Sequence, residues 1–122
     1  MRVFKTKWLG RFARRERITD ASLLEAIDRA ERGLIDADLG SGLIKRRVAR
    51  PGQGRSGVYR MIVVYRTMDR AIFLYGFAKS ERENIEAADL ADLGLIAADF
   101  LAADDKGFER IIAQEELQEV TP

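Results

Sequence analysis

The chain has 122 residues, 47% hydrophobic and 34% charged, a composition typical of one soluble globular domain. It contains neither cysteine nor histidine, which excludes disulfides, cysteine nucleophiles, thiolate metal sites and histidine acid–base catalysis. Any catalysis must therefore use Arg, Lys, Tyr, Asp or Glu, and we expect no cofactor. No apolar run approaches the roughly 20 residues of a membrane span and no signal peptide is recognisable, so we expect a cytoplasmic protein.

The net charge of +1 conceals a sharp asymmetry along the chain. Residues 1–82 carry 19 Lys and Arg against 9 Asp and Glu, whereas residues 83–122 carry 2 against 11. Such a division points to nucleic-acid binding by the basic part and to an acidic appendage. We therefore predict a basic core over residues 1–83 and an acidic helical extension over residues 84–122, both within one domain.

The first residues predict a short strand over 2–7, followed by a short amphipathic helix. Trp8, Leu9 and Phe12 fall at helical spacing, while arginines occupy the other positions. We expect Trp8 and Phe12 to pack in the core.

A second helix is predicted over residues 22–34. Ser22 and Glu25 fit a capping box, and apolar residues then recur at helical spacing. The glycine-containing segment 36–42 is predicted to be a loop.

The next stretch, residues 43–60, carries six cations and no carboxylate between its Lys45 and Arg60. Residues 43–50 alternate apolar and charged side chains, residues 51–54 have strong turn chemistry, and residues 58–65 form a β-branched and aromatic run. This pattern predicts a hairpin whose first strand lies near a sheet edge or a groove and whose second strand is buried. The six cations are Lys45, Arg46, Arg47, Arg50, Arg55 and Arg60.

A further buried strand is predicted over residues 71–78, antiparallel to its predecessor because the connection is short. From residue 84 an apolar stripe at helical spacing predicts a helix that Gly94 weakens or kinks, and Asp105 begins a second helix. The remainder is predicted to trail off as an acidic end.

A cation-rich site of this kind can hold the phosphates of RNA, since Lys and Arg bind phosphate and Arg does so with two parallel hydrogen bonds. RNA carries its own nucleophile, the 2′-hydroxyl. Positioning and electrostatics can then supply most of the catalysis without a metal ion. The composition therefore permits a metal-independent ribonuclease.

Several segments, in order along the chain, resemble the RelE/HigB-like toxins of type II toxin–antitoxin systems, and more narrowly the phage-type HigB branch. The resemblance spans Phe4 to about Asp99. It rests on FKTKW at 4–8, on RSGVYR at 55–60 running into IVVY at 62–65, and on GFAKSERENI at 76–85.

The resemblance implies an α+β fold: an antiparallel sheet with the N-terminal helices on one face and a basic groove on the other. It also implies an endoribonuclease that cuts translated mRNA at the ribosome. A cognate antitoxin, commonly a HigA-like helix-turn-helix protein, would neutralise it in a hetero-oligomer, and a homodimer is the alternative assembly. By position, the resemblance assigns catalytic roles to Lys45, Arg47, Arg60 and Lys79 and places Arg82 in the same basic segment as Lys79; RNA-binding roles are expected for Arg46, Arg50, Arg55 and Arg82.

Two departures from the family pattern concern proton transfer. Ser80 stands where RelE-type enzymes carry an arginine, and Glu86 stands where some carry a tyrosine. The proton-transfer residue is therefore open among Glu86, Glu81, Tyr75 and Lys45.

Two other functions remain as alternatives. ParE-like relatives share the fold but inhibit DNA gyrase, and a non-catalytic module would bind only RNA or the antitoxin. The charge division also suggests that the acidic extension folds over the basic groove or pairs with another subunit.

Overall fold

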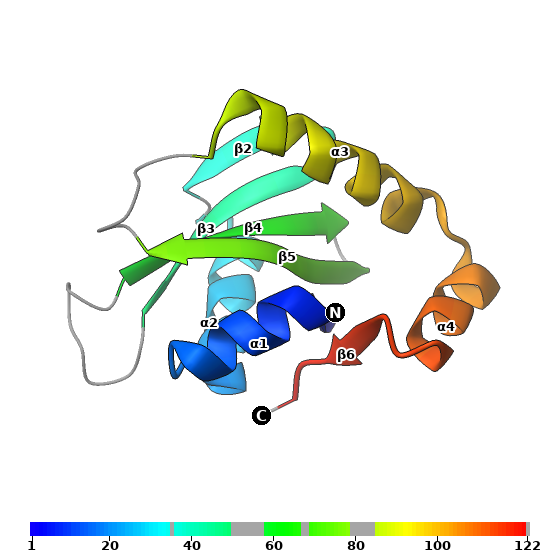
Figure 1. Cartoon of the computed structure of the whole chain (residues 1–122), viewed down its shortest axis with the longest axis horizontal. Coiled ribbons are helices and arrows are strands. Elements are labelled where there is room, and N and C mark those ends of the chain that lie inside the picture. Colours follow the sequence, from blue (N-terminus) through cyan, green and yellow to red (C-terminus); the bar gives the residue numbers. More distant parts are fainter. Residues whose placement is uncertain (35, 50–57, 67–68, 79–84, 122) are drawn as a thin grey trace.

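The computed structural model describes residues 1–34, 36–49, 58–66, 69–78 and 85–121. Within these ranges the chain forms four helices and six strands (Figure 1). The elements are β1 (Arg2–Thr6), α1 (Lys7–Arg15), α2 (Asp20–Glu31), β2 (Ala37–Gly40), β3 (Leu43–Ala49), β4 (Val58–Arg66), β5 (Arg70–Ala78), α3 (Ala87–Ala102), α4 (Asp105–Ala113) and β6 (Leu117–Glu119). The predicted α+β class is confirmed.

The six strands form one sheet in the order β2-β3-β4-β5-β1-β6. The pairs β2–β3, β3–β4 and β4–β5 join consecutive strands and are antiparallel, as expected for short connections. The pair β1–β6 is also antiparallel, although its strands come from opposite ends of the chain. The N-terminal strand β1, however, runs parallel to β5. The expectation of a purely antiparallel sheet is therefore wrong, because β1 reaches β5 only after two helices and three strands intervene.

Both edges of the sheet hold strands that the sequence did not predict. Within the predicted loop 36–42, β2 pairs with β3 through a two-residue turn at Ser41 and Gly42, whose φ angles are 54° and 78°. Positive φ at both central residues is the signature of the hairpin turn that matches strand twist. At the other edge, β6 pairs with β1, although the acidic end of the chain was expected to be irregular.

The two N-terminal helices agree with the sequence pattern, and a threonine caps the start of each. Thr6 accepts a hydrogen bond from the backbone N–H of Leu9 at the start of α1. Thr19 accepts one from Ser22 at the start of α2, so the helix begins two residues before the predicted cap. Threonine at this position satisfies a backbone donor that the first helical turn leaves unpaired.

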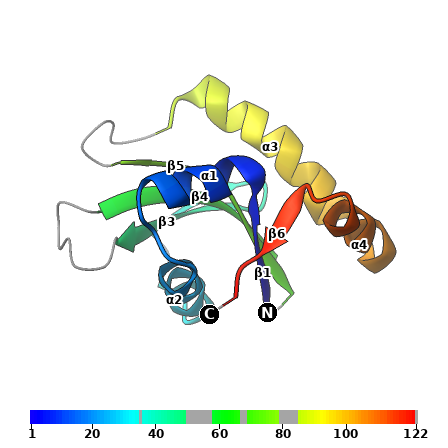
Figure 2. The ribbon, with the colours of Figure 1, turned by 60° about the horizontal axis from the view of Figure 1, so that its bottom comes forward.

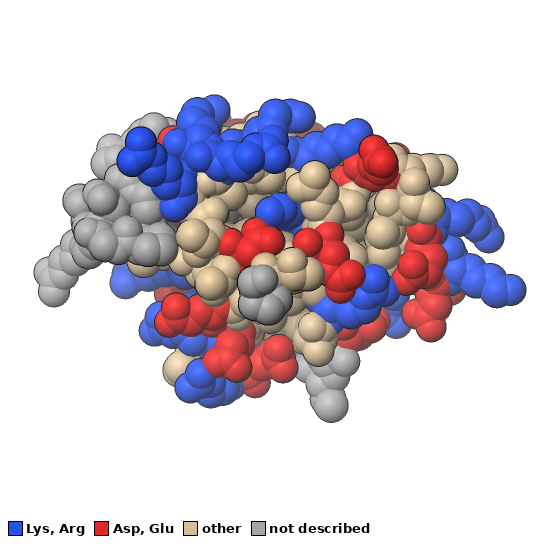
Figure 3. Space-filling model, turned by 90° about the horizontal axis from the view of Figure 1, so that it is seen from below, with Lys and Arg blue, Asp and Glu red and all other residues tan. Residues whose placement is uncertain are grey.

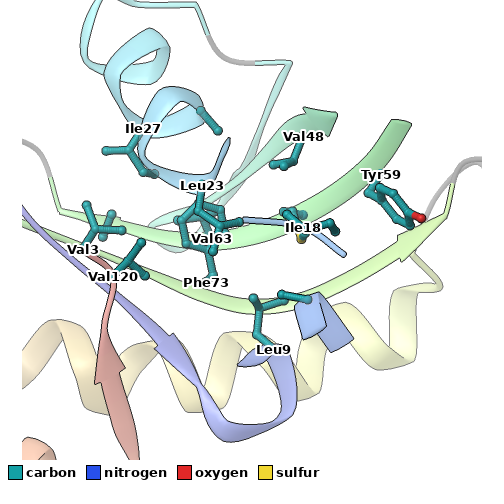
Figure 4. Packing of buried hydrophobic residues seen from close by; sticks show 14 of the residues in the cluster. Val3, Leu9, Ile18, Leu23, Ile27, Val48, Tyr59, Val63, Phe73 and Val120 are labelled. Carbon is teal, nitrogen blue, oxygen red and sulfur yellow. The ribbon is translucent and has the colours of Figure 1, made fainter. Parts of the chain in front are cut away.

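Helices α1 and α2 cover one face of the sheet and α3 covers the other (Figures 1 and 2). The first face buries a cluster in which Leu9, Leu23 and Ile27 from the helices meet Val63 and Phe73 from the central strands (Figure 4). On the opposite face Ala97 and Phe100 of α3, with Phe108 of α4, pack over apolar residues of β1, β3, β4 and β5. The sheet is therefore the middle layer of three.

The acidic C-terminal helices are attached to the sheet by their apolar sides. Gly94 lies inside one continuous helix, α3. Arg70, buried on β5, sits 4.0 Å from the ring centroid of Phe108, and its Nη1 donates a hydrogen bond to the Phe100 carbonyl oxygen. Asp89, Asp92 and Asp99 remain exposed on α3.

An irregularity in β5 decides which of its side chains reach each face. Ile62 pairs with Tyr75 but its neighbour Val63 pairs with Phe73, so Leu74 is an extra residue in β5. Strict alternation would place Tyr75 and Phe77 on the same face as Phe73. The β-bulge reverses this, and both rings lie on the face that α3 covers, while Phe73 stays on the other.

The same irregularity makes Gly76 a packing constraint. A methyl group there would lie 2.5 Å from Sδ of Met61 and 3.0 Å from Cε1 of Phe12, both buried. We predict that Gly76→Ala destabilises the protein by about 1–3 kcal/mol in urea denaturation, because the core must shift. Gly94→Ala is the control: apart from its chain neighbours and the backbone of its own helix, nothing lies within 4 Å of its added Cβ, so it should stabilise α3 by about 0.5–1 kcal/mol. A neutral Gly76→Ala would contradict this packing.

Candidate RNA-binding face

Three of the predicted site residues lie together on one face of the sheet. In the register between β3 and β4, Arg47 lies directly opposite Arg60, and Lys45 lies opposite Ile62. Paired residues of antiparallel strands project to the same face. Because Ile62 belongs to the cluster under α3, Lys45, Arg47 and Arg60 all lie on the α3 side of the sheet. We call these three residues the cation triad.

Placing Arg47 directly across from Arg60 is electrostatically unfavourable, since like charges opposite each other destabilise a sheet. Arg47 has partial compensation: its Nε lies 3.8 Å from Oδ1 of Asp36, and its side chain is 58% exposed. Arg60 is half-buried, and within the described part of the chain its buried Nε has no hydrogen-bond partner. A buried donor of this kind is suited to an anionic acceptor supplied from outside.

Arg46 points to the other face and is part of the core. Its side chain is 3% exposed. It donates hydrogen bonds from Nε to the Ala26 carbonyl oxygen at 3.1 Å, and from Nη1 to the Leu34 carbonyl oxygen at 2.6 Å and to Oδ2 of Asp36 at 3.1 Å. Burial lowers the pKa of Arg46, and the nearby Asp36 carboxylate acts in the opposite direction. The expected RNA-binding role does not fit this position, because strand alternation sends Arg46 away from the cation triad and under α2.

Aromatic side chains adjoin the cation triad on β5. Phe77 lies opposite Arg60, and Tyr75 lies opposite Ile62, two residue pairs further along. Trp8 of α1 stacks on Tyr75, with ring centroids 4.6 Å apart and an interplanar angle of 29°. The sequence predicted Trp8 to be a core residue, but it is 39% exposed. Helical spacing places Trp8 on the same side of α1 as the buried Phe12. It does not tell whether the Trp8 ring lies in the core or at the border of the sheet, so the sequence pattern could not predict its exposure.

Exposed cations continue along α1 beside this aromatic edge. Lys7, Arg11, Arg14 and Arg15 are all exposed. Figure 3 shows a band of Lys and Arg side chains along the edge of the molecule where α1 lies. The cationic surface therefore extends beyond the hairpin that the sequence singled out.

The remaining predicted site residues divide into two groups. Glu86 is the N-cap residue of α3; it is exposed, and its side chain makes no capping hydrogen bond. Arg50, Arg55, Lys79 and Arg82, together with Glu81, lie outside the described residues.

Two classes of feature are not found in the part of the chain that the structure describes. No group of three or more Asp and Glu side chains there is arranged to hold a metal ion. No helix there is long and apolar enough to cross a membrane.

The fold is a mixed sheet between two layers of helices, and one face of the sheet carries cations and aromatic rings side by side. These features define a small α+β protein with a cationic sheet face. The chain belongs to the family described as RelE toxin of RelE / RelB toxin-antitoxin system, whose model matches residues 1–120. It is therefore the toxin component of a toxin–antitoxin system, and membership of this family implies a cognate antitoxin. The resemblance to RelE-type toxins is confirmed, and the HigB branch stays a prediction. Comparison with curated proteins gives no match, and comparison with solved structures gives none either.

The contrast between Arg46 and Arg47 can be tested by stability. We predict that Arg46→Met destabilises the protein by about 1–3 kcal/mol, because two backbone carbonyls and Asp36 lose a buried donor. The neighbouring Arg47→Met should change stability by less than about 0.5 kcal/mol, since its side chain is exposed. Urea denaturation of both variants measures the difference. Equal effects would contradict the assignment of Arg46 to the core.

Proposed function

We propose that the protein is a metal-independent endoribonuclease that cleaves translated mRNA at the ribosome. The observation that carries the proposal is the direct opposition of Arg47 and Arg60, with Lys45 on the same face. A fold gains nothing from two arginines in that arrangement, whereas a phosphate lying between them would accept hydrogen bonds from both. Membership of the RelE toxin family supports the same conclusion.

The reaction uses the nucleophile that RNA itself carries. The 2′-oxygen attacks the adjacent phosphorus and the bond from phosphorus to the 5′-oxygen breaks, which leaves a 2′,3′-cyclic phosphate and a 5′-hydroxyl. One proton leaves the 2′-oxygen and one is delivered to the 5′-oxygen. The protein must align these atoms, stabilise the negative charge that develops on the phosphate, and assist both proton transfers.

The cation triad supplies the first two requirements. Arg60 and Arg47 hold the non-bridging phosphate oxygens from neighbouring strands, and within the described residues the buried Nε of Arg60 has no hydrogen-bond partner. Lys45, two residue pairs away on the same face, binds beside them and stabilises the 2′-oxygen as it loses its proton. These donors are held by a rigid sheet, so little reorganisation is needed during the reaction.

Proton transfer is assigned to a group among Lys45, Tyr75 and Glu86, with Glu81 as the fourth candidate. Tyr75 is half-buried and shares the face of the cation triad. Glu86 is exposed at the start of the helix that covers this face.

We further propose that the cognate antitoxin is a HigA-like helix-turn-helix protein and that the chain belongs to the HigB branch. The support is the order of the FKTKW, RSGVYR and GFAKSERENI segments.

The test is mRNA integrity in a cell-free translation reaction, with new ends mapped by primer extension. We predict discrete cleavage by the wild-type protein and a loss of about 100- to 1,000-fold in rate for Arg60→Ala, the effect of removing one transition-state donor. Arg66→Ala is the matched control: it removes the same charge from the same strand at its exposed end, where Arg66 pairs with Asp69. It should cleave like the wild type.

Two further arms separate the parts of the proposal. Ribosome-free RNA treated with EDTA should remain intact; its cleavage would remove the ribosome from the mechanism but keep the metal-free nuclease. Urea denaturation should show Arg60→Ala as stable as the wild type, because the substitution also removes a like-charge opposition. Intact mRNA in every translation reaction would overturn the proposal, and inhibition of gyrase supercoiling would then identify the ParE-like alternative.

A further inference from the structure

We propose that Tyr75, supported by Trp8, is a stacking site for an unpaired nucleobase of single-stranded nucleic acid bound by the free protein. This inference rests on the proposed function and deepens it, because it assigns a binding site to the base next to the phosphate that the cation triad holds. The residues come from β5 and α1, outside the hairpin to which the sequence pointed.

The sheet register places the phenol ring next to the phosphate-binding arginine. Arg60 pairs with Phe77, and Tyr75 is two residues before Phe77 on the same face. Diagonal neighbours in a sheet have Cα atoms roughly 7–8 Å apart, within reach of long and aromatic side chains. A phosphate at Arg60 and a base on Tyr75 could therefore belong to adjacent nucleotides.

The ring of Tyr75 is one end of a stack of three aromatic side chains. Trp8 lies in the middle, with its centroid 4.6 Å from that of Tyr75 and 5.3 Å from that of Phe12. Phe12 is buried on the far side of the sheet, whereas Tyr75 is half-buried and Trp8 is 39% exposed. Because Phe12 is buried, a further ring can join this stack at its Tyr75 end, the end nearest the cation triad. There the ring of Phe77 lies tilted beside Tyr75, with centroids 6.2 Å apart and an interplanar angle of 45°.

The charges around the stack fit a nucleic-acid strand. Lys7 and Arg11 lie within three residues of Trp8 on α1, and both are exposed. Together with Arg47 and Arg60 they put cations on both sides of the aromatic edge, and Figure 3 shows the band that α1 contributes. A groove that combines cations for the backbone with aromatic rings for the bases is the usual way of binding a single strand.

The ligand must be single-stranded, because a base inside a duplex does not expose its face for stacking. Every base has such a face, so the site tolerates any sequence and favours purines through their larger area. The stacking site therefore adds affinity and fixes the position of one base, while the phosphate contacts are independent of sequence.

The experiment compares two hexamers that carry the same phosphates and lack the 2′-hydroxyl, so neither can be cleaved: one of deoxyadenosine and one with abasic tetrahydrofuran sites. Trp8 is the single tryptophan of the chain, so its fluorescence reports binding directly. We expect the adenine hexamer to bind about 5- to 150-fold more tightly than the abasic one, the range measured for one stacked base. We also expect it to quench Trp8, which the abasic hexamer should leave nearly unchanged.

Variants assign the preference to the ring. Tyr75→Leu should reduce the affinity for the adenine hexamer to that for the abasic one, whereas Tyr75→Phe should retain the preference because the ring remains. Tyr65→Leu is the matched control: Tyr65 is a half-buried tyrosine on β4 that packs against the opposite core. It should leave the preference unchanged.

The outcomes distinguish this inference from the proposed function. Equal affinity for the two hexamers, or a preference that survives Tyr75→Leu, would overturn the stacking site, while mRNA cleavage that depends on Arg60 would still stand. Failure of both hexamers to bind would likewise overturn it for the free protein. If translation reactions also showed no cleavage, the proposed function would fall with it.

Discussion

The register between β3 and β4 is the constraint on which the rest of the structure depends. Met61, Ile62, Val63 and Val64 are buried on both faces of the sheet, so β4 cannot slip along its neighbour without exposing one apolar set and burying another. That register sets Arg47 against Arg60 as a consequence. The burial of the apolar residues of β4 therefore imposes the unfavourable opposition of Arg47 and Arg60 at the other end of this pair of strands.

The same alternation divides neighbouring cations between two tasks. Arg46 enters the core under α2, where two carbonyl oxygens and Asp36 satisfy its donors. Arg47, one residue later, lies on the opposite face and is exposed. Asp36 contacts both: Arg46 through its guanidinium, and Arg47 through its backbone N–H, which donates a hydrogen bond of 2.5 Å. One carboxylate thus holds β3 in place through contacts with both residues.

The face that carries the cation triad acquires its aromatic side through the bulge at Leu74. Without that extra residue, Tyr75 and Phe77 would lie with Phe73 under the N-terminal helices. With it, Gly76 turns toward Phe12 and Met61, and Tyr75 meets Trp8 around the edge of β5. The bulge therefore places aromatic side chains of α1 and β5 beside the cations of β3 and β4. Bulges often redirect side chains in this way near functional sites.

Periodicity and local turn chemistry in the sequence determined four of the six described strands and all four described helices. The α+β class and the joint role of Lys45, Arg47 and Arg60 came from the charge pattern together with the resemblance to RelE-type toxins. The sequence did not reveal the parallel pairing of β1 with β5, the edge strands β2 and β6, the core position of Arg46, or the exposed stack at Trp8. Each of these depends on contacts between distant residues. Three residues such as Leu117–Glu119 form a strand only because β1 offers an unpaired edge, and Arg46 is buried only because α2 and Asp36 supply its acceptors.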